Sequence, residues 1–361
     1  MKWPGPHTWL IEANHKCPSW LRKKNKVAVR VPDLNICQNL LNSIAMPITS
    51  TSANRTKQRP IKNYREACRQ YKKSVHIIKG RIGKNKKPSQ AQLEGLDIIL
   101  FDIQDVGVRF YTYISTLHYI MEACAENEIP LIVLDRPNPN GHYVDGPVLK
   151  PEFKSFVGMH PVPVVYGMTI GEYARMINGE KWLDNGVQCD LSVIEIEGYD
   201  HETPYLLPIK PSPNLPNEKA VNLYPSLCFF EGTTVSCGRG TEQQFQIFGS
   251  PELPEAVFSY TFTPEPNFGA KYPKHQGKKC FGRNLQDTDR LDELNLEWLI
   301  EAYQNHKEKD SFFNDFFVKL AGTAALRQDI EDGLSPDSIR DRWQKDIIAF
   351  KSIREKYLLY D

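Results

Sequence analysis

Two apolar segments constrain the fold of this chain more than any other feature. LDIILFDI (96–103) and IPLIVLDRP (129–137) are apolar between their polar ends, as in strands that are buried on both faces of a sheet. The segment between them, 114–128, repeats apolar residues with the period of a helix. A strand, a helix and a strand within roughly 40 residues form a βαβ unit with a right-handed crossover. The sequence therefore predicts an α/β protein with a parallel sheet.

Two helix starts carry recognisable caps. Thr169 with Glu172 three residues later predicts a capping box for a helix at 170–178. Ser335 followed by Pro336 predicts the start of a C-terminal helix. Its apolar stripe indicates core packing. The residues of this stripe are Ile339, Trp343, Ile347, Phe350, Ile353 and Tyr357.

The remaining segments beyond residue 90 are one strand and one long loop region. CDLSVIEI (189–196) predicts a further strand. Proline and glycine are frequent between residues 203 and 273, which indicates loops over a site rather than regular structure.

Charge divides the chain near residue 90. Residues 1–90 hold 20 Lys and Arg against three acidic residues, a net +17, whereas residues 91–361 hold 25 against 41, a net −16. We interpret this as two parts with different partners or different origins. The basic part predicts strands at 27–32 and 75–78, helices at 34–44 and 63–74, and a linker at 80–89.

Several classes of protein are excluded. No apolar run reaches the 18 or more residues of a membrane span, and prolines interrupt the first 25 residues where a signal peptide needs an apolar core. The chain is therefore cytoplasmic by default.

The eight cysteines have no metal or redox spacing and are expected to be reduced, mostly buried thiols. No metal or cofactor is expected, and the separated His118, His142, His160 and His201 are interpreted as ordinary surface or core residues.

Polar clusters follow both strands of the βαβ unit, where parallel sheets bind ligands. Their acids, arginines and amides can hydrogen-bond a hydroxyl-rich substrate while the tyrosine faces stack on a sugar. The alternative is structural, with an Asp105–Arg109 ion pair and half-buried core tyrosines. The first cluster comprises Asp102, Gln104, Asp105, Arg109, Tyr111 and Tyr113, and the second Asp135, Arg136, Asn138 and Asn140.

Glu231 lies in a third cluster, FFEGTTVSCGRGT (229–241), after two phenylalanines and before Arg239, which stands between two glycines. Apolar rings disfavour the charged form of a carboxyl group, which suits it to act as a general acid. The glycines let a ligand approach the backbone closely. The alternative is a helix-capping or salt-bridged glutamate.

Six motifs resemble, in the same order, the NamZ-type exo-β-N-acetylmuramidases over about residues 84–361. They are FDIQDVGVRFYTYIST (101–116), LDRPNPNG (134–141), SFVG (155–158), YGMTIGEYA (166–174), PSPNLPN (211–217) and LYPSLCFFEGTTVSCGRGT (223–241). The resemblance implies a Rossmann-like domain joined to a smaller α/β domain, with the site in the cleft between them. It also implies release of terminal N-acetylmuramic acid from peptidoglycan fragments.

The same resemblance implies roles for the three clusters. Glu231 becomes the acid or the nucleophile, and the two strand-end loops hold the sugar. Arg109 or Arg239 becomes the cation for the lactyl carboxylate of muramic acid. The chain lacks the family's opening βα units with their Pro-Glu-His-Gly segment, which supplies one proposed catalytic carboxylate. Glycoside hydrolysis ordinarily uses two carboxyl groups, so weak or absent activity is expected.

Residues 3–83 resemble another family, the second half of the YrdC/TsaC threonylcarbamoyl-AMP synthases. WPGPHTWLIEA (3–13), VAVRVPD (27–33) and PITSTSAN (47–54) carry this resemblance. Those enzymes join threonine, bicarbonate and ATP for a tRNA modification, and they present a basic concave surface. The first half of that fold, with its nucleotide-binding Lys/Arg motif, is missing. The remaining nucleotide-binding matches are Arg30, Ser50, Ser52 and Asn54.

Three functions follow from these observations. The first is hydrolysis of a muropeptide or muramic-acid glycoside. The second is weak RNA or nucleotide binding by residues 1–90, which should weaken steeply with salt. The third is an inactive product of a gene fusion, frameshift or chimera, because KNKKPS (84–89) suits both families. The cellular compartment is also open, since NamZ-type proteins are often periplasmic or secreted.

The sequence thus predicts a YrdC-like α/β fragment at 1–83, an incomplete Rossmann-like parallel-sheet domain at 84–220 and a smaller α/β domain at 221–361. Loss of the family's first units would expose an edge of the sheet. Glu231 is predicted to line a pocket shared with the Asp102–Arg109 loop. No second carboxylate is expected opposite it at the roughly 5–9.5 Å spacing of glycosidases.

Overall fold

The computed structural model describes residues 86–361 and two short strands, β1 (Trp9–Glu12) and β2 (Lys26–Val29). β1 and β2 pair antiparallel, with Trp9 opposite Val29. β2 overlaps the strand predicted at 27–32. The predicted elements at 34–44, 63–74 and 75–78 lie outside the described residues, as do Arg30, Ser50, Ser52 and Asn54.

A parallel sheet forms where the sequence predicts it. β3 (Ile99–Phe101), β4 (Leu131–Leu134) and β5 (Leu191–Ile194) pair in the order β3-β4-β5. Helix α4 (Tyr113–Glu126) connects β3 to β4, and α5 (Ile170–Gly179) precedes β5. The predicted βαβ unit is therefore confirmed.

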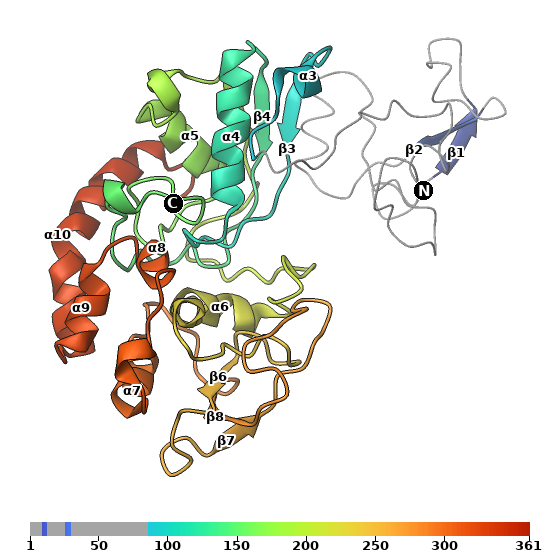
Figure 1. The fold of residues 1–361 in the computed structure, drawn as a ribbon. Helices are drawn as coiled ribbons and strands as arrows, with labels where there is room; N and C mark the ends of the chain where they lie inside the picture. The colour runs from blue at the N-terminus through green and yellow to red at the C-terminus, as the bar shows by residue number, and fades with distance from the viewer. Residues whose placement is uncertain (1–8, 13–25, 30–85) are drawn as a thin grey trace.

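Helices α4 and α5 pack against each other beside this sheet (Figure 1). Their apolar faces and the strands enclose one hydrophobic core. A fully buried Leu, Ile or Phe side chain stabilises a fold by about 1.5–3 kcal/mol relative to an exposed one. The core residues include Phe101, Ile114, Leu117, Met121, Leu131, Val133, Ile170 and Tyr173.

A second sheet is antiparallel. β6 (Ile247–Ser250), β8 (Cys280–Asn284) and β7 (Tyr260–Phe262) pair in the order β6-β8-β7. Figure 1 shows this sheet in the lower part of the molecule with α6 (Glu218–Leu227) and α7 (Glu297–Asn305), below the parallel sheet. Residues 86–361 are therefore mixed α/β with two separate sheets.

The segment 203–273 holds more regular structure than predicted, because α6, β6 and β7 all lie within it. Pro225 sits inside α6 and has no N–H to donate to the carbonyl of Val221. The Nδ2 of Asn140 donates to that carbonyl instead, at 3.2 Å. A tertiary hydrogen bond thus replaces the bond that proline removes. The prediction of loops throughout this segment is wrong.

Helix α10 (Pro336–Arg354) joins the two cores. Ser335 caps it, accepting a hydrogen bond from the Ser338 N–H, and Pro336 is its first residue, as predicted. Ile339, Trp343 and Ile347 are buried in the larger core around α6. The last turns reach the core of the parallel sheet, where Phe350 is buried and Ile353 and Tyr357 pack.

The remaining described elements are short. None of the described helices is long and apolar enough to cross a membrane. The five described cysteines are buried free thiols, as predicted for them. The further helices are α3 (Gln90–Leu93), α8 (Phe317–Ala321) and α9 (Ala325–Glu331), with 3₁₀ turns at Pro151–Phe153, Asp184–Gly186, Cys228–Gly232, Lys309–Ser311 and Glu355–Tyr357.

The predicted capping box of α5 is present and is coupled to a buried carboxylate. The Thr169 hydroxyl accepts from the Glu172 N–H, and it also donates to Oδ2 of Asp135 at 2.7 Å. Thr169→Ala should therefore lower the free energy of unfolding by about 1–2 kcal/mol or slightly more, measured by urea unfolding. The control Ser335→Ala removes an exposed cap and should cost at most about 1 kcal/mol. Equal losses for the two variants would contradict the coupling.

Candidate functional site

Polar side chains from β3 and β4 meet at the carboxyl end of the parallel sheet. Nη2 of Arg136 lies 2.5 Å from Oδ1 of Asp102, and both side chains are partly exposed. The Nε2 of Gln104 donates to the carbonyl oxygens of Asp105 and Pro137, each at 2.8 Å. The two strand-end loops are therefore tied together by residues predicted to bind a substrate.

Asp105 is buried and is held by uncharged groups. Its Oδ2 accepts hydrogen bonds from the Gly107 N–H, at 2.8 Å, and from the Tyr166 hydroxyl. Burial raises the pKa of Asp105 to about 7, although these hydrogen bonds oppose the shift. No ion pair joins Asp105 to Arg109. The structural alternative stated above, an Asp105–Arg109 ion pair, is therefore not present.

Arg109 is fully buried and binds backbone carbonyls from distant parts of the chain. Nη1 donates to Pro147 and Val162, both at 2.7 Å. Nη2 donates to Leu320 and Ala321 at the end of α8, at 2.9 and 2.7 Å. Burial lowers its pKa to about 9, so the guanidinium stays charged at neutral pH. The prediction that Arg109 contacts the substrate is corrected, because the side chain is fully buried and both Nη atoms donate to carbonyls inside the protein.

Asp135 is likewise buried in a hydrogen-bond network. Oδ1 accepts from the N–H groups of Gly171 and Arg136, and Oδ2 accepts from the hydroxyls of Thr169 and Tyr360. Burial raises its pKa to about 6, against the opposing effect of these four donors. All of its hydrogen bonds are internal, so Asp135 anchors α5 and the C-terminal residues rather than facing solvent.

Asn138 and the tyrosines also make internal contacts. Asn138 is buried, and its Nδ2 donates to the Met168 carbonyl at 2.9 Å. The half-buried Tyr111 donates to the Pro211 carbonyl at 2.9 Å and packs edge-on against Tyr113. Of the residues predicted after the two strands, the partly exposed Asp102, Gln104, Arg136, Tyr111 and Tyr113 remain accessible to a ligand.

Glu231 lies in a different place, on the wall of a pocket of about 530 Å³. Its Oε1 is 2.5 Å from Nη1 of Arg239, and the two side chains are 24% and 39% exposed. Burial opposes the charge of Arg239, but the Glu231 carboxylate outweighs this effect and raises the pKa of Arg239. Phe229 and Phe230 do not shield Glu231 from water as predicted, because both rings are buried in the core. Arg239 therefore pairs directly with Glu231.

The pocket is not shared with the strand-end loop as predicted, since no residue of 102–109 lines it. The two regions are connected indirectly by the loop 211–214. Tyr111 binds the carbonyl of Pro211, and the Nδ2 of Asn214 donates to Gly269, which lines the pocket, at 2.8 Å. Among the described residues that line the pocket, Glu231 is the only carboxylate.

Sequence reasoning missed several other residues that line this pocket. Lys271, Tyr272 and Lys274 come from one loop, and Phe316 comes from the residue before α8. Nζ of Lys274 donates to the carbonyls of Phe230, Thr233 and Val235, at 3.0, 2.5 and 2.9 Å. The available signal was the clustering of two lysines and a tyrosine in the Pro- and Gly-rich stretch NFGAKYPK (267–274).

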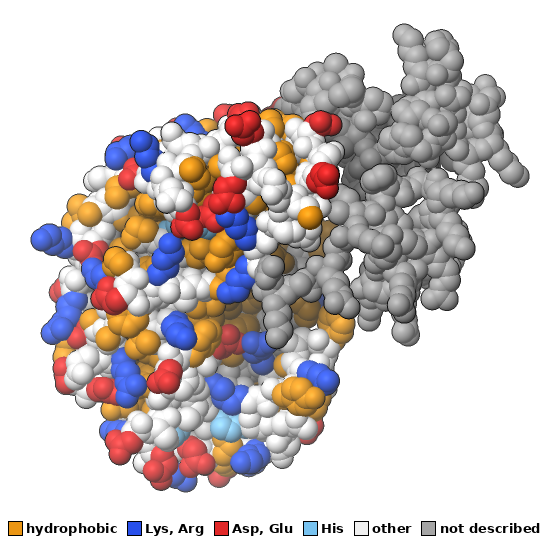
Figure 2. Space-filling model, turned by 45° about the horizontal axis from the view of Figure 1, so that its top comes forward, with side chains coloured by type: hydrophobic (Ala, Val, Ile, Leu, Met, Phe, Trp, Pro, Cys, Tyr) orange, Lys and Arg blue, Asp and Glu red, His pale blue; other side chains and the backbone are white. Residues whose placement is uncertain are grey.

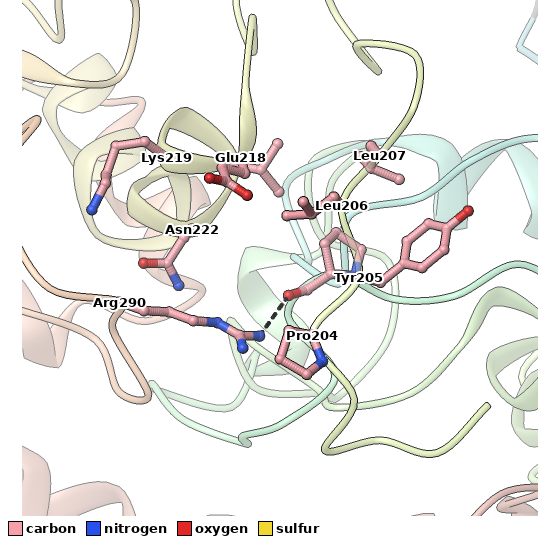
Figure 3. A pocket seen from close by; sticks show the side chains of 10 residues that line it. Pro204, Tyr205, Leu206, Leu207, Glu218, Lys219, Asn222 and Arg290 are labelled. Atoms are coloured by element: carbon pink, nitrogen blue, oxygen red, sulfur yellow. Dashed lines mark hydrogen bonds between the residues drawn. The ribbon is translucent and has the colours of Figure 1, made fainter.

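A second, smaller pocket of about 190 Å³ lies between α6 and the loop at 204–207 (Figure 3). Leu206 and Leu207 lie on one side and Glu218 and Asn222 of α6 on the other. Arg290 reaches across to the Pro139 carbonyl at 3.4 Å. No motif in the sequence indicated this pocket.

Two histidines interpreted as ordinary residues meet inside the protein. Nδ1 of His118 lies 2.9 Å from Nε2 of His160, and both rings are buried. His118 also lies beside Glu122 at 3.4 Å. Burial lowers the pKa of both imidazoles. Within residues 86–361 no group of three or more potential ligands is placed to hold a metal ion.

Charge is mixed on the visible surface. Figure 2 shows acidic and basic side chains interspersed with apolar ones over the described face. The net negative charge of residues 91–361 is therefore not gathered into one acidic patch on that face.

Three family models match the chain. The model described as exo-beta-N-acetylmuramidase NamZ, N-terminal, matches residues 53–219, and its C-terminal counterpart matches residues 222–360. The Sua5/YciO/YrdC model, described as telomere recombination, matches residues 1–91. The first and third matches overlap at residues 53–91, around the stretch in which the sequence resembles both families.

Similar proteins agree with these matches. Peptidoglycan beta-N-acetylmuramidase NamZ of Bacillus subtilis is 40% identical over 301 residues, which cover 77% of this chain and 71% of that protein. Two crystal structures of DUF1343 family proteins from Bacteroides fragilis match 77% of this chain and 79% of each neighbour. They have TM-scores of 0.74 and 0.66 at 50% and 28% identity.

The first 90 or so residues match a different enzyme. Threonylcarbamoyl-AMP synthase of Methylobacillus flagellatus is 41% identical over 92 residues, or 25% of this chain. The chain spans about half the length of the synthases that it matches, 51% in this case.

Replacing Arg109 tests its assignment to the interior. Arg109→Met leaves four buried carbonyls without their donor and should lower the free energy of unfolding by about 3–5 kcal/mol. The control Arg283→Met breaks the partly exposed Arg283–Glu301 ion pair and should cost less than about 1 kcal/mol. Urea unfolding measures both. An Arg109→Met protein of normal stability that binds its substrate poorly would restore the binding role.

Asp105→Asn should change how stability depends on pH. A carboxyl group with a pKa of about 7 in the folded state and about 4 when unfolded binds its proton more tightly when folded. Its contribution to stability therefore falls as the pH rises from about 4 to 7, by up to about 1.4 kcal/mol per pH unit. We expect the Tm of the variant, relative to wild type, to be higher at about pH 7.5 than at about pH 5. Equal differences at the two pH values would show that Asp105 does not titrate in this range.

Proposed function

Because the chain belongs to the family of NamZ exo-β-N-acetylmuramidases, we propose that it binds the terminal N-acetylmuramic acid of peptidoglycan fragments in the Glu231 pocket and hydrolyses its glycosidic bond. The observation that carries this proposal is the Glu231–Arg239 ion pair on the pocket wall. A volume of about 530 Å³ lies within the usual range of small-molecule sites.

The ion pair favours one of the two roles open to Glu231. Pairing with Arg239 needs the carboxylate form, and a carboxylate can attack the anomeric carbon or stabilise an oxocarbenium-like transition state. The acid role needs a protonated group in the same place. Glu231 therefore acts as the nucleophile or stabiliser, and Arg239 orients it.

The number of carboxylates in the pocket limits the rate. Glycosidases pair an acid with a nucleophile or base, whereas Glu231 is the only carboxylate among the described lining residues. With the described lining residues alone, no carboxylic acid protonates the leaving group, which then takes its proton from water. General acid catalysis typically contributes about 10²–10⁴-fold, so turnover is slow relative to a two-carboxylate enzyme.

The pocket also has the surfaces that a sugar needs. Tyr272 and Phe316 present aromatic rings from two separate segments. The backbone approaches closely where Gly240 meets Pro273, since a Cβ on Gly240 would lie 2.5 Å from the Pro273 ring. Gly240 has a φ of +86° and could not be replaced without strain. This contact fixes the loop that carries Tyr272 against the loop that carries Arg239.

Substitution of Glu231 tests the proposal on a chromogenic N-acetyl-β-muramide. Glu231→Gln should lower the rate of release at least about 100-fold with little change in Tm, because it removes charge that stabilises the transition state. The matched control is Glu301→Gln, since Glu301 is also a partly exposed glutamate paired with an arginine. Its rate should equal that of wild type. Release that is unaffected by Glu231→Gln would refute the assignment.

A further inference from the structure

The pocket around Glu231 carries an excess of positive charge. Its described lining residues include the cations Arg239, Lys271 and Lys274 against the single carboxylate of Glu231. Such an excess attracts a ligand that is itself negatively charged. The three cations differ in how much of their hydrogen-bonding capacity is free.

Two of the cations make internal contacts. Arg239 is paired with Glu231, and its Nη2 also reaches the Gly269 carbonyl at 3.5 Å. Lys274 has an ammonium group with three donors, and three backbone carbonyls accept from it. Burial lowers the pKa of Lys274. All three donors of Lys274 are therefore used inside the protein, whereas Arg239 keeps free N–H donors but its charge is already offset by the Glu231 carboxylate.

Lys271 is different. Its side chain is exposed and makes no hydrogen bond or ion pair with any described residue. Its Nζ lies over the ring of Tyr272, 5.1 Å from the ring centroid. Tyr272 is itself 81% exposed, so much of its ring is open to a ligand. A free cation and an open aromatic face therefore lie side by side on the wall of the pocket.

The backbone on both sides of this pair is fixed. Oδ1 of Asn267 accepts from the N–H groups of Gly269 and Ala270 at 3.0 and 2.9 Å. Asn214 binds the Gly269 carbonyl, and Lys274 is held by its three carbonyls. Lys271 and Tyr272 thus project from a short segment anchored at both ends. This arrangement reduces the ordering cost of binding a ligand there.

We propose that Lys271 binds the lactyl carboxylate of N-acetylmuramic acid while the sugar packs on Tyr272. This inference rests on the proposed function, and it replaces Arg109 and Arg239, which the sequence suggested for that contact. Lys271 selects the anionic sugar over N-acetylglucosamine, which has the same ring without the lactyl group. The Lys271 contact lies near the surface, so added salt weakens it.

The test measures binding without turnover, by titration calorimetry of the full chain with N-acetylmuramic acid and with N-acetylglucosamine. Lys271→Met should weaken binding of N-acetylmuramic acid about five- to tenfold and leave binding of N-acetylglucosamine unchanged. Lys271→Arg should retain most of the selectivity. The control Lys278→Met removes the same charge from an exposed position outside the pocket and should change neither affinity.

Three outcomes overturn the inference: equal loss for both sugars, no loss for either, or failure of the wild-type chain to bind N-acetylmuramic acid. Failure of the proposed function gives a different result. In that case wild type binds N-acetylmuramic acid selectively through Lys271, but releases nothing from the chromogenic muramide.

Discussion

The buried guanidinium of Arg109 is the interaction on which the described structure depends. Arg109 lies in the loop after β3. Its guanidinium binds carbonyls about 40, 50 and more than 200 residues away along the chain, including those of the last two residues of α8. A cation at the end of a helix is favourable for the free carbonyls and the helix dipole. Gly322, which ends α8 with a φ of +72°, leaves no room for a side chain, because a Cβ there would lie 2.7 Å from Nη2 of Arg109. One side chain thus joins the parallel-sheet part to the helices that precede α10, and α10 joins the same two parts through its apolar face.

This internal use of polar groups determines where a ligand can bind. Asp105, Asp135 and Asn138 stand at the carboxyl ends of strands, the usual ligand position in a parallel sheet, but their hydrogen bonds are internal. Accessible groups also line the pocket around Glu231, which has a carboxylate, three cations and two aromatic residues. The loop 211–214 connects the two regions through Tyr111 and Asn214. The proposed site is therefore positioned by the strand ends without being lined by the 102–109 loop.

Local patterns in the sequence were sufficient to predict helices and strands, but not the contacts between them. The apolar runs, the Thr169–Glu172 capping box and the Ser335–Pro336 start all depend on neighbours within a few residues, and each is found where predicted. Regular structure in 203–273 was missed, because Pro225 is tolerated only through Asn140, 85 positions earlier. The same limit applies to the site. Nothing adjacent to Arg109 reveals that its partners include carbonyls near residue 320. Nothing adjacent to Lys271 reveals that it lines the same pocket as Glu231.

A crystal structure of the chain soaked with N-acetylmuramic acid would show whether the Glu231 pocket holds this sugar. We expect the sugar ring against Tyr272, its anomeric carbon facing Glu231 and its lactyl carboxylate within hydrogen-bond distance of Nζ of Lys271. A sugar bound at the Asp102–Arg136 pair, or in the smaller pocket between α6 and residues 204–207, would contradict it.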